Sequence, residues 1–429
     1  MPRQRTRPAP RPAQKRHPVS KRPAVPPAPG QKAGEGKLKS RLRLFSTRSG
    51  MDLTFFILVL ALVAIGLVMV CSASYANASY RFDNPYYFVA QQARWAVIGV
   101  VLMIVISFFD YHHLHRLVPL FAIVTLVTLA ITVVFKDTKL VQNNNGAYRW
   151  ITIGSFSFQP SEIAKFTLVL LLAQILSAHV FSPKRRRDLT RNEKLEQRRL
   201  MLEVLVVVVA ICGLVVLERH MSATIILLLL AVIMLFVAGA PLRWFAVGGA
   251  GIAGALLLML ATPLYSHVGG RIAGWLNPFN PPEGVDTWQT QQSLYAIGSG
   301  QLLGLGLGNS RQKYMYLPEP QNDFIFAIVC EELGFIGALI IILMFGVLIW
   351  RGVMISLRAK DRFGMLLGIG LTMQVGIQVV LNIAVVTNTI PNTGISLPFF
   401  SAGGTSLVML LAQMGILLSI SRTSSIEKT

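Results

Sequence analysis

Ten long apolar runs interrupt this sequence, and they restrict its fold more than any other feature. As a helix, a run of about 17–25 apolar residues is long enough to cross the ~30 Å hydrocarbon core of a bilayer. Inside lipid the backbone must satisfy its own hydrogen bonds, which favours helices. Charged residues make up 14% of the chain, against about 25% in an average soluble domain. We therefore predict an all-α, polytopic membrane protein with ten transmembrane helices, at residues 53–74, 93–109, 117–135, 163–181, 202–217, 222–240, 243–264, 324–350, 363–387 and 404–421.

Basic residues gather in three segments between or before these runs, and they predict the orientation of the chain. Fourteen Lys or Arg residues and one Glu precede the first run, eight Lys or Arg lie in 184–199, and four lie in 351–362. Short loops rich in Lys and Arg stay on the cytoplasmic side. Both termini are then cytoplasmic, and a large extracellular loop, 265–323, separates the seventh and eighth helices.

The basic N-terminal segment accounts for most of the net charge, +13 of the formal +21. Residues 1–50 are rich in Pro, Ala, Lys and Arg, a composition that cannot bury enough apolar surface to fold. We predict a disordered cytoplasmic tail held near anionic lipids, with a docking arm for a cytoplasmic partner as the alternative. Nucleic acid is not an expected partner, because no aromatic side chains are interleaved for base stacking. The membrane domain then covers 51–422, and 423–429 form a cytoplasmic C-terminal tail.

The three cysteines, Cys71, Cys212 and Cys330, fall in separate predicted spans. We expect neither a disulfide framework nor a CxxC metal pair from them. The sequence shows no internal repeat of fixed period, which disfavours a transporter built from inverted repeats. The glycine-rich run 298–310 lacks the GK[ST] ending and the preceding strand of a nucleotide-binding loop.

Polar residues beside the fourth span form the first candidate site. The segment 143–166 begins as a loop broken at Gly146, and Pro160 then starts a helix. Glu162 and Lys165 are three residues apart on one helix face and can form an ion pair. That pair is either functional or only an anchor for the helix at the membrane surface.

Three further segments place polar groups where lipid or the membrane surface is expected. In the outer turn 217–224, we interpret His220 as a hydrogen-bonded turn residue rather than a metal ligand. Glu331 and Glu332 lie two turns inside the eighth span and must find partners within the bundle. The prolines and glycines of 388–406 forbid a regular helix, so this segment is predicted to fold back into the outer leaflet, with hydroxyls and amides available to an anionic headgroup.

Three sequence motifs resemble signature segments of one known family. They are "GAYRWITIGSFSFQPSEIAKF" (146–166), "LLGLGLGNSRQKYMYLPEPQNDFIFAIVCEELGFIG" (302–337) and "PNTGISLPFFSAGGTS" (391–406). They closely resemble the SEDS family (shape, elongation, division and sporulation), which includes FtsW, RodA and SpoVE. The likeness extends from about residue 52 to 421 and is greatest to FtsW and SpoVE of Gram-positive bacteria.

The resemblance implies a peptidoglycan glycosyltransferase that polymerises lipid II at the outer face of the bacterial cytoplasmic membrane, with inversion at the sugar. It also implies a class B penicillin-binding protein as the transpeptidase partner, other divisome proteins, and a place at the division septum. A role in elongation or sporulation stays open. A lipid II flippase, using charges such as Glu331, Glu332 and Lys165, and a non-catalytic scaffold are the alternative functions.

The sequence departs from the family at the expected catalytic carboxylate. Relatives usually carry Asp-Pro soon after the "NP" of the outer loop. In this chain that place falls on Asn280-Pro281 if a small gap is allowed, or on Pro282 without one, and neither residue is a carboxylate. Asp286, at a shifted position, is the first candidate for the general base, and Glu283 is the second. Otherwise the chain is catalytically weak, because the amide of Asn280 is a poor base.

The remaining expected site residues would bind the substrate through polar, cationic or backbone groups near the outer face. They are Arg149, Trp150, Gln159, Ser161, Glu162, Lys165, Arg271, Gln289, Gln292, Ser293, Arg311, Lys313, Asp323, Ser401, Gly403 and Gly404. Cations must balance the charge that gathers on the pyrophosphate leaving group. A divalent cation, Mg²⁺ or Mn²⁺, is therefore an expected cofactor with unknown ligands, and no organic cofactor is expected.

Overall fold

The computed structural model describes residues 50–136, 138, 140–144, 147–154, 156–179, 181, 190–261 and 266–424. The predicted basic tail therefore lies outside the described residues except for Gly50. The same is true of Gly146, of residues 184–189 in the basic loop, and of residues 425–429 in the C-terminal tail.

Every apolar run named above overlaps a helix. These helices are α2 (Leu53–Phe82), α3 (Tyr87–Phe108), α4 (Leu114–Val134), α5 (Pro160–Ala178), α6 (Arg191–Leu217), α7 (Met221–Val237), α8 (Leu242–Ala261), α11 (Ile325–Leu357), α12 (Arg362–Val386) and α13 (Gly404–Ser424). A short 3-10 helix, η1 (Tyr111–His113), precedes α4. Among the described residues, eight helices are long and apolar enough to cross a membrane: α2 to α6 and α11 to α13. The multi-pass membrane protein predicted from the apolar runs is thus confirmed.

Two outer segments contain regular structure that the sequence analysis did not predict. The loop 265–323 contains α9 (Ser266–Leu276) and α10 (Trp288–Gly300). The all-α prediction is wrong for the segment before α5, which forms a three-stranded antiparallel sheet in the order β1 (Val141–Asn144), β2 (Ala147–Ile153) and β3 (Phe156–Phe158). Its alternation of aromatic, β-branched and polar residues suits a strand that is half-buried.

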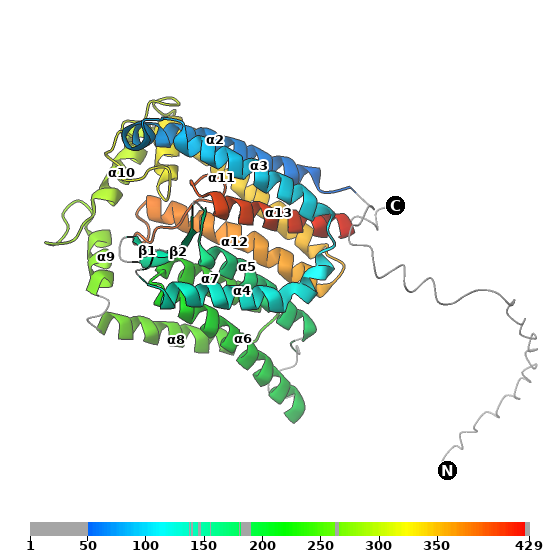
Figure 1. Ribbon diagram of the computed structural model, residues 1–429. Helices are drawn as coiled ribbons and strands as arrows, with labels where there is room; N and C mark the ends of the chain where they lie inside the picture. The colour runs from blue at the N-terminus through cyan, green and yellow to red at the C-terminus, as the bar shows by residue number, and fades with distance from the viewer. Residues whose placement is uncertain are drawn as a thin grey trace, which may run out of the picture. The chain divides into compact units, whose positions relative to one another are not determined.

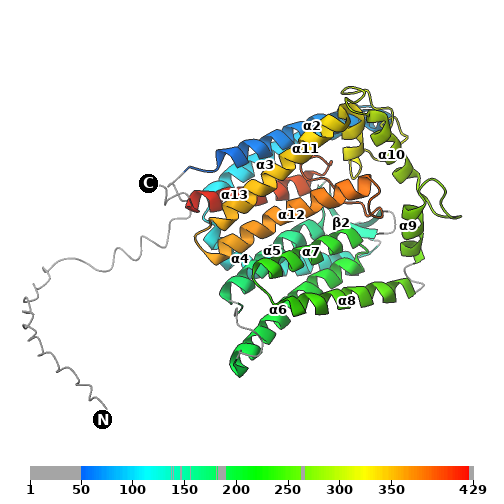
Figure 2. The same ribbon diagram turned by 180° about the vertical axis from the view of Figure 1, so that it is seen from behind.

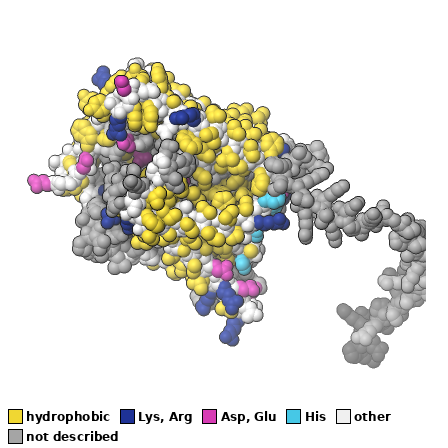
Figure 3. Space-filling model, in the orientation of Figure 1, with side chains coloured by type: hydrophobic (Ala, Val, Ile, Leu, Met, Phe, Trp, Pro, Cys, Tyr) yellow, Lys and Arg dark blue, Asp and Glu magenta, His cyan; other side chains and the backbone are white. Residues whose placement is uncertain are grey.

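The spanning helices lie roughly side by side, and α12 is the most enclosed of them (Figures 1 and 2). In an 18-residue apolar stretch of α12, 72% of the residues are buried, compared with 22% in the corresponding stretch of α3. α12 packs against α5, α7 and α11, while α3 packs along α13. Figure 3 shows most charged side chains toward the ends of the helices, with hydrophobic side chains between. This distribution is the one expected of a bundle surrounded by lipid.

Between α12 and α13 the chain has no helix from residue 387 to 403, as the prolines and glycines predicted. Asn382 of α12 connects this segment to the turn before α11, because its Nδ2 donates to the carbonyls of both Asp323 (2.7 Å) and Ile395 (2.6 Å). The Ala402 N–H donates to the Gln321 carbonyl at 2.8 Å. Two irregular segments, 321–323 and 395–402, are thereby joined at one end of the bundle.

We expect Asn382→Ala to destabilise the fold by about 2–4 kcal/mol, because the carbonyls of Asp323 and Ile395 both lose their buried donor. Asn382 is fully buried, so water cannot readily replace the amide. The measurement is thermal unfolding in detergent. Thr387→Ala, which removes an exposed hydroxyl at the end of the same helix, is the control and should melt like the wild type. Equal melting temperatures for the two variants would contradict this role of Asn382.

Candidate functional site

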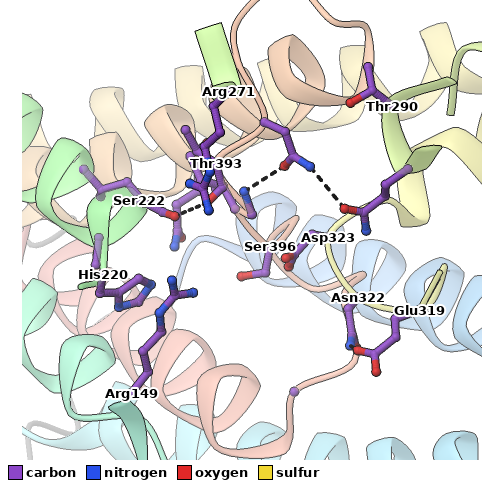
Figure 4. Close-up of a pocket in the computed structure, with 18 of the residues that line it drawn as sticks. Arg149, His220, Ser222, Arg271, Thr290, Glu319, Asn322, Asp323, Thr393 and Ser396 are labelled. Atoms are coloured by element: carbon purple, nitrogen blue, oxygen red, sulfur yellow. Dashed lines mark hydrogen bonds between the residues drawn. The ribbon is translucent and has the colours of Figure 1, made fainter. Parts of the chain in front are cut away.

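A cavity of about 730 Å³ lies at the end of the bundle where the irregular segments meet. Its wall is built from β2, the start of α5, the start of α7, α9, α10 and the two joined segments described above. Figure 4 shows side chains from several of these elements pointing toward one space. A cavity of this size suits a ligand as large as a drug or a sugar-phosphate headgroup.

The cavity collects ten of the expected site residues. They are Arg149, Trp150, Gln159, Glu162, Lys165, Arg271, Asp286, Gln289, Asp323 and Gly403. The others lie outside its wall: Ser161, Asn280, Glu283, Gln292, Ser293, Arg311, Lys313, Ser401 and Gly404. Residues that are more than a hundred positions apart in the sequence therefore meet here.

Asp286 is the candidate base that the structure places at the cavity. Its side chain is exposed at the rim, and its Oδ1 accepts a hydrogen bond from the Trp288 N–H at 2.9 Å, at the start of α10. Glu283 and Asn280 are also exposed, but neither lines the cavity. Of the three positions considered for the base, only Asp286 therefore combines a carboxylate with access to this space.

Three cationic side chains line the cavity: Arg149, Lys165 and Arg271. Lys165 Nζ pairs with Glu162 Oε1 at 2.7 Å, so the ion pair expected from their spacing is present and faces the cavity. Arg149 donates from Nη2 to the carbonyl of Arg219 at 3.2 Å. Burial, and then the nearby Arg271, lower the pKa of Arg149. Two guanidinium groups close enough to affect each other favour an anion between them.

Asp323 faces the cavity from the turn before α11 (Figure 4). Burial raises the pKa of this carboxyl to about 6, while the charge of Arg149 opposes the rise. The Asn382 amide donates to the Asp323 carbonyl at 2.7 Å, which holds the backbone from which this side chain projects. Asp323 is thus a second cavity carboxylate, set deeper than the exposed Asp286.

His220 also lines the cavity, at the start of α7. Its Nδ1 lies 3.5 Å from Gln159 Nε2, in agreement with a hydrogen-bonded turn residue. Burial, then Arg149 and Lys165, hold the pKa of His220 well below its usual value. The imidazole is therefore neutral at pH 7 and can exchange hydrogen bonds with a ligand without adding charge.

Glu218, two residues before His220, is fully buried outside the cavity. Thr132 donates its hydroxyl to Glu218 Oε1. Burial raises the pKa of Glu218 to about 8, although Thr132 and Arg149 act in the opposite direction. The carboxyl is therefore mostly protonated at pH 7, and its role in the turn is that of a neutral hydrogen-bonding group.

We expect the stability of Glu218→Gln, measured relative to the wild type, to rise as the pH goes from 6 to about 8 and to level off above that. The folded pKa of Glu218 lies above its ordinary value of 4.5, so wild-type stability falls as the pH rises from about 4.5 to about 8. The glutamine variant does not undergo this loss. The measurement is the melting temperature of both proteins from pH 6 to 9. A constant difference across that range would contradict the raised pKa.

The two adjacent glutamates of α11 form a separate buried network with the Lys313 side chain and the Arg311 backbone. Lys313 Nζ pairs with Glu332 Oε1 at 3.1 Å and is only 3% exposed. Glu331 accepts hydrogen bonds from the backbone of the outer loop, including Arg311 N at 2.9 Å. Lys313 is thus engaged in an ion pair, and the exposed Arg311 side chain does not line the cavity. The prediction that Lys313 and Arg311 bind substrate rested on their place in an outer segment, which does not reveal the direction of a side chain.

Sequence reasoning did not single out several polar residues that line the cavity. They are Ser222, Glu319, Asn322, Gln378, Asn392, Thr393 and Ser396. Asn392 Nδ2 donates to Gln289 Oε1 at 3.1 Å, and Ser222 donates its hydroxyl to the Thr393 carbonyl. The hydroxyls and amides of 388–406 were noted as a group. Gln378 could have been found from the sequence, because a polar amide in the middle of a membrane span indicates a functional or buried polar site.

The cavity offers few protein ligands for a divalent cation. Within the described residues, no group of three or more His, Cys, Asp or Glu side chains is placed to hold a metal. Mg²⁺ needs only one or two protein carboxylates when phosphate oxygens and water complete its shell. Asp323 is a carboxylate available for this use, because it faces the cavity.

Together, the apolar helices define a multi-pass membrane protein, and the polar cavity at one end of the bundle suits a polar, anionic ligand. A family model described as "Cell cycle protein", for FtsW, RodA and SpoVE, matches residues 52–426. The chain belongs to this family.

Individual relatives cover nearly the same part of the chain. Stage V sporulation protein E of Bacillus subtilis is 40% identical, over 88% of this chain and 98% of the relative. A probable peptidoglycan glycosyltransferase FtsW of Trichlorobacter lovleyi is 36% identical, over 86% and 93%.

Two solved structures have a similar fold. One, described under "Structural coordination of polymerization and crosslinking by a peptidoglycan synthase complex", gives a TM-score of 0.66 at 25% identity and covers 88% of this chain and 99% of that chain. The rod shape determining protein RodA of Thermus thermophilus gives a TM-score of 0.62 at 25% identity, over 88% and 98%.

Proposed function

We propose that the chain is a peptidoglycan glycosyltransferase that polymerises lipid II in the cavity at the outer end of its helices. The observation that carries the proposal is the meeting of a rim carboxylate, Asp286, with the guanidinium groups of Arg149 and Arg271 in one cavity. Glycosyl transfer from a pyrophosphate needs a base for the attacking hydroxyl and cations for the leaving group. Membership of the family and the FtsW relatives support the same reaction.

In this reaction Asp286 takes the proton from the 4-hydroxyl of the acceptor sugar. The hydroxyl oxygen forms a bond with C1 of the donor sugar, and the bond from C1 to the pyrophosphate breaks on the opposite face, which inverts the anomeric centre. Arg149 and Arg271 stabilise the negative charge that gathers on the pyrophosphate. A divalent cation held by Asp323 would neutralise part of the same charge when bound.

The proposed membrane arrangement has ten spans, which adds α7 and α8 to the eight long apolar helices. Both termini are cytoplasmic, and the loop 265–323 is extracellular in the bacterial cytoplasmic membrane. The Lys and Arg residues before α2, near the start of α6 and between α11 and α12 support this orientation. The basic N-terminal tail, 1–50, would then lie against the anionic inner leaflet.

The proposed partners are a class B penicillin-binding protein, which would cross-link the new strand, and other divisome proteins. Both follow from the family resemblance. An FtsW-like role at the division septum is supported by several FtsW relatives, whereas the 40% identity to stage V sporulation protein E supports sporulation as the second role.

A lipid II carrier is less well supported than an enzyme. The carrier hypothesis used Glu331, Glu332 and Lys165 along a path through the bundle. Glu332 is instead paired with Lys313, and Glu331 binds the outer loop, while Lys165 pairs with Glu162 in the cavity. A non-catalytic scaffold would not need the carboxylate and guanidinium groups that meet at the cavity.

The test is the fate of labelled lipid II in liposomes that contain only the purified chain. We expect glycan strands of increasing length. Movement of lipid II between leaflets without polymer would support the carrier. If lipid II is neither polymerised nor moved, the scaffold is supported.

A further inference from the structure

An apolar segment of the outer loop, residues 301–307, has no part in the proposed reaction. Its leucines are exposed: Leu302, Leu303, Leu305 and Leu307, with Leu303 at 79%. The chain has no charged residue between Asp286 and Arg311. Leucines grouped on a surface without charges are unfavourable in water and mark a surface that contacts something apolar.

The segment is attached to α11 where that helix is interrupted. Gly334 adopts φ 68° and ψ −171°, which breaks the run of helical hydrogen bonds. The N–H groups of Phe335 and Ile336 instead donate to the carbonyls of Gln301 (2.9 Å) and Leu302 (3.1 Å). Two carbonyls of the apolar segment are thus satisfied by a membrane-spanning helix.

Hydrogen bonds in the other direction complete the attachment. The Leu305 N–H donates to the Glu331 carbonyl at 2.9 Å, and the Gly306 N–H donates to the Glu332 carbonyl at 3.0 Å. A Cβ at Gly304 would lie 2.2 Å from the Glu332 carbonyl oxygen, so only glycine allows this approach. Irregular backbone is tolerated at membrane depth when protein groups satisfy it in this way.

The apolar surface of the segment continues onto α11. Directly after the break, Phe335 and Ile336 are exposed, followed by Leu339, Ile340 and Leu343 on the same helix. α11 is long and apolar enough to span a membrane, so its exposed side chains face lipid. Because the leucines are attached beside this face, lipid is the occupant that the surface fits.

We propose that residues 301–307 lie within the outer leaflet, with the side chains of Leu302, Leu303, Leu305 and Leu307 among lipid acyl chains. The outer loop is then not wholly in water. α10 runs from the rim near Asp286 to this segment and packs against α11 (Figures 1 and 2). Insertion therefore sets the depth of the cavity rim relative to the lipid headgroups.

The test measures the surroundings of a nitroxide spin label on the purified chain alone in phosphatidylethanolamine–phosphatidylglycerol liposomes. All labelled variants are made in a protein that carries Cys71→Ala, because Cys71 is partly exposed and would react with the label. Cys212 and Cys330 are buried and are left in place. Leu303→Cys and Leu307→Cys are the test variants. Glu283→Cys, at an exposed position of the same outer loop, is the water reference, and Leu343→Cys, exposed on α11, is the lipid reference.

At residues 303 and 307 we expect high collision rates with oxygen and low rates with a water-soluble nickel chelate, as at residue 343. The oxygen-to-nickel ratio should exceed that at residue 283 several-fold. Nickel accessibility similar to that at residue 283 would place the leucines in water and overturn the proposal. Protection from both reagents would show that protein covers the leucines, as a second copy would, and would overturn it too. Neither readout depends on glycosyltransferase activity.

Discussion

Replacing Asp286 by asparagine should lower the rate of lipid II polymerisation by about 10²–10⁴-fold, the contribution typical of a general base. The fold should be unaffected, because the side chain is exposed and an asparagine oxygen can still accept the Trp288 N–H. The loss should appear in kcat more than in KM, since the base acts on the attacking hydroxyl in the transition state. The measurement is the initial rate of strand formation by purified protein.

Glu283→Gln and Asn280→Asp are the matched controls for this prediction. Both positions are exposed in the same outer loop and lie outside the cavity wall, so both variants should keep activity close to the wild type. If Asn280→Asp raises the rate greatly while Asp286→Asn has no effect, the base belongs at position 280 and this assignment is wrong.

Replacing Arg149 by alanine should lower kcat by about 10²–10³-fold, comparable to the loss of one preorganised donor to a developing anion. Arg149 is anchored to the Arg219 carbonyl, and its guanidinium faces the cavity near Arg271 (Figure 4). Arg149→Lys should recover part of the rate, because a lysine keeps the charge but not the fixed geometry of the guanidinium. The measurement is single-turnover kinetics at saturating lipid II.

Arg311→Ala is the control for the guanidinium prediction. Both arginines belong to outer segments, but the side chain of Arg311 is exposed outside the cavity, so its removal should leave kcat near the wild-type value. Similar losses in both variants would show that general positive charge at the outer face matters, rather than a defined anion site.

The sequence was sufficient to predict the membrane helices, because a bilayer imposes a length and a composition that few other structures share. It also predicted the interruption at 388–406, where prolines and glycines exclude a helix. The sheet β1–β3 was not predicted, because its strands are as short as three residues and Gly146, between β1 and β2 in the sequence, favoured a loop.

The candidate site was predicted in part, and the failures have a common physical cause. Arg149, Lys165 and Lys313 are all basic residues on or near outer segments. Only the fold distinguishes the first two, which line the cavity, from Lys313, which pairs with Glu332. Asn322 and Asn392 were missed because an asparagine in a loop is ordinary in sequence and becomes informative only when its neighbours are known.

The most direct test of the central claim is a structure of the Asp286→Asn variant bound to lipid II. The account predicts density for the sugar-pyrophosphate headgroup in the cavity of about 730 Å³, with the pyrophosphate within hydrogen-bonding distance of Arg149 or Arg271. Headgroup density at another place on the protein, for example beside the Glu331–Glu332 network, with the cavity empty, would contradict it.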